Sequence, residues 1–221
     1  MTGRPTRDVR GRAGRPPSPG AALLGACLLL AACAGTPGAP KARLLRPGPQ
    51  SLPSNTVTGD FIIAQLEQAT VSIRALPREG LDRYYQSQRD VIHPFADLPA
   101  GAPQPTAFLL HLRNDSPDPL SFDPTAARLV DQEGRRLIPL DYAALYAFLA
   151  GIGQGGERLR AVQRTVLTAT IAVPSGGERW GLLLFPELSA GARAVLVDLA
   201  GLYRGSAEQL LVFQFVVVEE R

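Results

Sequence analysis

The chain has 221 residues and a formal charge of +3 at pH 7, but five of its 23 Lys and Arg residues and one of its 20 Asp and Glu residues precede Cys33. The 18 bases and 19 acids that remain are nearly balanced, which argues against a nucleic-acid partner, because such a partner needs a basic surface. Both cysteines, Cys27 and Cys33, lie in the N-terminal part, so no disulfide framework is expected and stability must come from a hydrophobic core.

The N-terminus has the three parts of an export signal: five arginines, an apolar run over residues 21–32, and small residues before a cysteine. Leu30-Ala31-Ala32-Cys33 resembles the lipobox of bacterial lipoproteins. The resemblance implies removal of residues 1–32, attachment of lipid to the Cys33 thiol and acylation of the new N-terminus. Two or more acyl chains anchor a protein stably.

Two other interpretations of this segment fit less well. An uncleaved transmembrane helix needs about 20 apolar residues, and this run holds about a dozen. Leu24-Gly25-Ala26-Cys27 fits the lipobox loosely, but too little of the apolar run precedes it. Cys33 is therefore the predicted lipidation site.

Residues 33–56 are predicted to be a tether, because they are rich in proline and glycine and lack hydrophobic periodicity. The remaining residues, 57–221, are predicted to form a single domain. No internal repeat is visible in it.

Strands are predicted wherever apolar residues alternate with polar ones or form short runs between turn signals. Gln132-Glu133-Gly134 marks a hairpin between two of them. The last predicted strand is apolar on both faces, which predicts a central strand that is covered on both sides. The predicted strands cover residues 70–75, 108–112, 127–130, 137–140, 167–173, 180–185, 194–199 and 210–218.

Two segments interrupt the strands. Residues 80–93 predict at best a short polar helix, and residues 141–150 predict a better one, with Asp141 as its cap and Gly151 at its end. We therefore expect a mainly β protein, an antiparallel sandwich with one or two short helical insertions, near residues 80–95 and 141–160.

Over residues 107–219 the order of signals resembles the immunoglobulin-like, telokin-type sandwich of many exported bacterial lipoproteins. The resemblance depends on Phe108 to Asn114 followed by a proline turn, on Leu129-Val130-Asp131 with Gly134, and on Val173-Pro174-Ser175-Gly176-Gly177 leading into a strand. The insertion at residues 141–164 departs from that pattern. Members of this kind are usually binding or accessory modules, which is what the likeness implies.

No cofactor or metal site is expected. Gly151, Gly153 and Gly156 have the spacing of a dinucleotide-binding loop, but a helix precedes them where a strand is needed, which favours a plain loop. His93 and His111 are too few for a structural zinc site without cysteines, and His111 is interpreted as a sheet residue. No serine lies in a nucleophile elbow, so no catalytic residue is predicted.

Aromatic residues of the two insertions form a candidate partner-binding face, because aromatic side chains are enriched at protein interfaces. The alternative is that they pack the insertions onto the sheet. The candidate residues are Tyr84, Tyr85, Tyr142, Tyr146, Phe148 and Trp180.

These observations favour a non-catalytic lipoprotein of the cell envelope, held to the membrane through Cys33, that binds another envelope protein or assists an assembly. Ala34 after the cysteine favours the outer membrane by resemblance, with the outer face of the cytoplasmic membrane as the alternative. The rival is an envelope hydrolase or ligand-binding enzyme whose carboxylates meet only in the fold. Its candidate acids are Asp60, Asp82, Asp90, Asp141 and Glu157.

Overall fold

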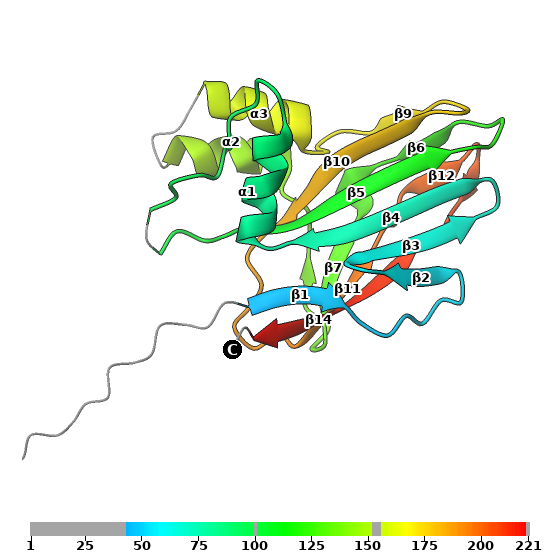
Figure 1. The fold of residues 1–221 in the computed structure, drawn as a ribbon, viewed down its shortest axis with the longest axis horizontal. Helices are drawn as coiled ribbons and strands as arrows, with labels where there is room; N and C mark the ends of the chain where they lie inside the picture. Colours follow the sequence, from blue (N-terminus) through cyan, green and yellow to red (C-terminus); the bar gives the residue numbers. More distant parts are fainter. Residues whose placement is uncertain (1–42, 100, 152–155, 220–221) are drawn as a thin grey trace, which may run out of the picture. The chain divides into compact units, whose positions relative to one another are not determined.

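The computed structural model describes residues 43–99, 101–151 and 156–219, which belong to one compact unit spanning Pro40–Arg221. The predicted signal peptide and Cys33 lie outside the described residues. Within these ranges the chain is mainly β, with three antiparallel sheets and three α-helices, which confirms the predicted class and is consistent with a β-sandwich (Figure 1).

The first sheet holds strands from both ends of the described chain. β14 pairs with β1 on one side and with β11 on the other. In spatial order its strands are β1 (Arg43–Pro47), β14 (Val212–Glu219), β11 (Ala194–Asp198), β7 (Arg128–Asp131) and β8 (Arg136–Leu137).

The second sheet is a meander of four strands with a later strand added at one edge. In spatial order its strands are β10 (Glu178–Phe185), β5 (Thr106–Asn114), β4 (Ala69–Leu76), β3 (Phe61–Leu66) and β2 (Asn55–Thr58). A smaller third sheet consists of β13 (Ala207–Glu208), β12 (Leu202–Arg204), β6 (Leu120–Phe122) and β9 (Ile171–Val173).

The main core lies between the second sheet and the other two, because alternate residues of each strand point to the same face. Phe108 on β5 is fully buried, and its ring packs against Phe185 on β10 and Phe215 on β14. Ring centroids are 5.9 Å apart in the first pair and 5.2 Å in the second. Phe108 therefore joins the two larger sheets.

A second apolar cluster lies on the opposite face of the second sheet, under the helices α1 (Arg78–Ser87), α2 (Tyr142–Gly151) and α3 (Glu157–Thr165). Leu109 and Leu182 of the sheet are buried there against helical residues such as Leu81. Figure 1 shows the three helices gathered at one end of this sheet. The rest of that face carries no helix among the described residues.

Polar turn residues fix the chain where the sequence predicts turns. Asn114 is buried, and its side-chain amide donates to the carbonyls of Asp118 and Val173 while its oxygen accepts from Ser116. The Asp141 carboxylate accepts from the backbone N–H of Ala144 at 2.7 Å and caps α2. A single 3₁₀ turn, Pro124–Ala126, completes the described elements.

Two expectations need correction. The predicted tether of residues 33–56 overlaps the folded unit, because Arg43–Pro47 pair with β14 and Asn55–Thr58 pair with β3. The last strand is central in its sheet as expected, but only one of its faces is buried, since the helices cover the second sheet and not the first. The strands with helices over one face and the main core on the other are β5, β10 and the end of β4.

Candidate functional site

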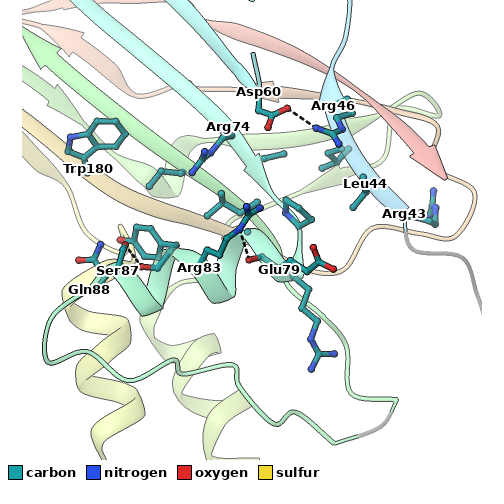
Figure 2. Close-up of a pocket in the computed structure, with 18 of the residues that line it drawn as sticks. Arg43, Leu44, Arg46, Asp60, Arg74, Glu79, Arg83, Ser87, Gln88 and Trp180 are labelled. Atoms are coloured by element: carbon teal, nitrogen blue, oxygen red, sulfur yellow. Dashed lines mark hydrogen bonds and ion pairs between the residues drawn. The ribbon is translucent and has the colours of Figure 1, made fainter. Parts of the chain in front are cut away.

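A cleft of about 1050 Å³ opens beside α1, bounded by β1 and by the ends of β4 and β10. Its floor includes Arg74, Ala75 and Leu76 of β4 and Leu109 of β5. The helices leave this part of the second sheet uncovered. The sheet therefore forms the floor of the cleft, and α1 forms one of its walls. Figure 2 shows Arg74 and Arg83 between Trp180 on one side and Arg46 on the other.

Positive charge dominates this cleft, which we call the arginine cleft. Its lining includes seven arginines and two acidic residues, Asp60 and Glu79, so positive charges exceed negative charges by five. Residues 33–221 hold 18 bases and 19 acids and are nearly neutral as a whole, so the cleft concentrates its bases. The seven are Arg43, Arg46, Arg74, Arg78, Arg83, Arg164 and Arg179.

One of the seven has a carboxylate partner among the described residues: Arg46 contacts Asp60 at 2.7 Å. Arg83 donates through Nε to the carbonyl of Glu79 on its own helix, and Arg164 donates to the carbonyl of Asp90. Their guanidinium groups therefore keep most of their donors free for an anion.

Of the seven arginines, Arg74 is the least exposed. Its guanidinium carbon is 4.7 Å from the centre of the Phe61 ring, a cation–π contact, and its Nε is buried without a hydrogen-bond acceptor among the described residues. A buried donor without an acceptor is costly, so this position is strained by its own charge and by its unpaired N–H.

Trp180 forms the far wall and is held in place from behind. Its ring stacks on His111 with centroids 3.8 Å apart and planes 8° apart, while 45% of the residue stays exposed. His111 is fixed by Glu178 at 3.0 Å and lies 3.5 Å from the hydroxyl of Ser72. The open face of the indole is thus available to a ligand, and His111 serves as a sheet residue with satisfied ring nitrogens.

The position of α1 depends on buried contacts behind it. Leu81 and Tyr85 are buried in the second cluster, and the Tyr85 hydroxyl lies 2.9 Å from that of Thr165 on α3. Burial raises the pKa of Tyr85 well above its usual range. Burial also raises the pKa of Tyr84, partly opposed by the nearby Arg179 guanidinium, so both phenols stay neutral.

The six aromatic residues expected to form one face lie in three settings. Tyr84 and Trp180 line the arginine cleft, whereas Tyr85 and Phe148 pack in the second cluster. Tyr142 and Tyr146 lie one turn apart on α2 and are 38% and 52% exposed. Partner binding by these residues stays a prediction.

The five acids of the enzyme alternative lie in different places and make different contacts. Asp60 lines the cleft and pairs with Arg46, Asp82 contacts His93 at 2.9 Å, and Asp141 caps α2. Asp90 adopts a positive φ of 56° in a turn, and Glu157 faces Arg160 at 3.8 Å. Of the five, Asp60 alone is a cleft residue within the described ranges.

Other expected features are placed as follows. The glycine loop begins where α2 ends at Gly151, and residues 152–155 lie outside the described part. Across residues 43–99, 101–151 and 156–219, no group of three His, Cys, Asp or Glu side chains has the geometry to hold a metal. Within the same ranges, none of the helices has the length and apolarity needed to span a bilayer.

The cleft arginines were missed at the sequence level. They come from positions 43 to 179, on β1, β4, α1, α3 and β10, and no local motif joins them. Nor does the local charge balance mark them, because Glu79 and Asp82 lie between Arg78 and Arg83 in the sequence.

Comparison with known proteins gives little further. No family model matches the chain, and no curated protein matches it. The crystal structure of the YjhA protein from Bacillus subtilis aligns with 63% of this chain and 77% of that chain, at a TM-score of 0.36 and 8% sequence identity. A likeness at this level carries no argument about function.

Proposed function

We propose that this chain is a lipid-anchored lipoprotein of the cell envelope that acts as a non-catalytic binding or assembly module. Its Cys33 carries the lipid, the outer membrane is the favoured location, and the domain is an immunoglobulin-like, telokin-type sandwich. The lipobox-like sequence and the order of strand and turn signals support this proposal.

The observation that carries the binding role is the arginine cleft. Uncompensated guanidinium groups around an open cleft repel one another, which costs stability and favours occupation by an anionic partner. The cleft holds an exposed indole and a buried unpaired donor beside these charges. Aromatic and arginine side chains are the residues that contribute most at protein interfaces.

The place of β1 adds support for a partner close to the membrane. Ten residue steps separate Cys33 from Arg43, the first residue of β1, and such a length reaches at most about 35 Å. Under this proposal the partner of the cleft belongs to the same membrane or lies near it.

The anchor and the binding role can be tested separately. Mass spectrometry of the mature N-terminal peptide should find acylated Cys33, and Cys33→Ser should leave an uncut chain. For the binding role, full-length protein is isolated from membranes after mild crosslinking, as wild type, as Arg83→Gln/Arg179→Gln, and as the control Arg136→Gln/Arg193→Gln.

All four arginines are exposed, and the control pair lies outside the cleft. We expect a reproducible partner with wild type and with the control, and its loss with the cleft variant. Equal recovery with all three proteins contradicts a role for the cleft. Recovery of no partner with any of them contradicts the proposed function.

A further inference from the structure

β1 lines the arginine cleft with an edge that no described strand pairs with. The backbone N–H of Gly48 donates to the carbonyl of Gln214. This bond determines which alternate residues of β1 form hydrogen bonds with β14. The N–H of Val217, opposite Leu45, donates to Arg193 on the far side of β14. Leu45 therefore directs its own N–H and carbonyl away from β14, because paired residues alternate between bonded and non-bonded positions.

The same alternation governs the neighbours of Leu45. The carbonyls of Arg43 and Pro47 point to the free side, and Pro47 has no N–H to leave unpaired. The free side of β1 thus offers two donors, at Arg43 and Leu45, and three acceptors within five residues. Unpaired strand edges of this kind accept an additional strand.

The positive charge near this edge favours an acidic sequence in the added strand. Arg46 projects from β1 beside Asp60, and Arg74 and Arg83 face the same space from β4 and α1, as Figure 2 shows. An extended chain places alternate side chains on one face about 7 Å apart, so several carboxylates on that face would meet successive arginines. Trp180 offers an apolar surface at the other end of the cleft.

We propose that the arginine cleft binds an extended acidic segment of a partner protein, which adds as a strand to the free edge of β1. This inference rests on the proposed binding function and names the chemistry of its partner. A peptide backbone uses both the donors and the acceptors of β1, which a phosphate ion or a lipid headgroup leaves partly unused. Carboxylates of the segment account for the excess of arginine.

The test uses the mature lipoprotein in a non-ionic detergent and a synthetic peptide of ten alternating Glu and Val residues. Binding is followed by fluorescence of Trp180, the sole tryptophan of the chain. A second peptide has the same sequence with an N-methyl group on every residue, so that both of its edges lose their donors. Inorganic phosphate and vesicles containing anionic phospholipid are the competing probes.

We expect the Glu-Val peptide to bind and the N-methylated peptide to bind at least about tenfold more weakly, because each lost hydrogen bond contributes on the order of a factor of five. Arg83→Gln/Arg179→Gln should weaken peptide binding by roughly fivefold to tenfold, since exposed ion pairs are individually weak. Arg136→Gln/Arg193→Gln should leave it unchanged.

Equal binding of the two peptides overturns strand addition, and both peptides are measured against the unaltered protein. Binding of phosphate or vesicles without binding of the peptide overturns the peptide partner in favour of an anion or membrane site. If no probe binds while a cleft-dependent partner is recovered from membranes, the strand-addition proposal is wrong and the proposed function stands.

Discussion

Repulsion among the cleft arginines predicts that removing one of them stabilises the free protein. Arg83 is exposed on α1, and its one hydrogen bond among the described residues is to its own helix. Glutamine has nearly the same helix propensity, so Arg83→Gln removes charge with little other change. The effect should therefore report the electrostatic environment of the cleft alone.

The magnitude follows from the size of the cleft. A volume of about 1050 Å³ is on the order of 10 Å across, and two unit charges at that separation in water interact by about 0.4 kcal/mol. The other lining residues present four net positive charges to Arg83. At 10 mM salt the Debye length is about 30 Å, so the substitution should raise the free energy of unfolding by about 1 kcal/mol. At 1 M salt the Debye length is about 3 Å and the gain should vanish.

Urea denaturation followed by Trp180 fluorescence measures this difference at both salt concentrations. The control is Arg136→Gln on β8, an exposed arginine outside the cleft with no carboxylate partner among the described residues. A gain for Arg83→Gln that is as large at 1 M salt, or equal to that of the control, refutes the electrostatic reasoning. A loss of stability at low salt refutes it as well.

Three further predictions concern the packing that positions the cleft. Tyr85→Phe should lower the free energy of unfolding by about 1 kcal/mol, because the hydroxyl contact with Thr165 is lost while the ring stays buried; equal stability in urea contradicts it. Burial lowers the pKa of His93 in spite of the Asp82 carboxylate, so the unfolded chain takes up this proton first. Stability should therefore fall as the pH drops through about 6.5. If the melting temperature of a His93→Gln variant falls with pH as steeply as that of the wild type, this prediction is wrong. Phe108→Leu should cost about 1 to 3 kcal/mol through two lost aromatic pairs, and a double-mutant cycle with Phe215→Leu should show coupling.

Local patterns predicted the strands because burial on one face leaves a period of two in the sequence. Alternation at Val71, Ile73 and Ala75 marks β4, and Gly134, at a φ of 79°, closes the predicted hairpin of β7 and β8. The same reasoning missed β1, since a strand at a sheet edge can contain proline and charge without losing its pairing to β14.

The site could not be predicted from local patterns, because strand pairing and helix packing bring its residues together. Arg46, Arg74 and Arg179 are distant in the chain and have no common motif. Alternation also predicted a strand that is longer than the one observed. Residues 167–170 alternate in the sequence, but α3 ends at Thr165 and the regular pairing of β9 begins at Ile171. Sequence reasoning also placed Trp180 in a strand without indicating that its ring stacks on His111 and faces a cleft.

Site-specific photo-crosslinking in cells can show whether the arginine cleft holds a partner protein. A photoreactive residue at Ser87, in the lining of the arginine cleft, is compared with one at Ser206, which is exposed in the turn between β12 and β13. We expect a specific adduct from Ser87 that disappears with Arg83→Gln/Arg179→Gln, and none from Ser206. Adducts from both positions, or an Ser87 adduct that survives the loss of the two arginines, would contradict it.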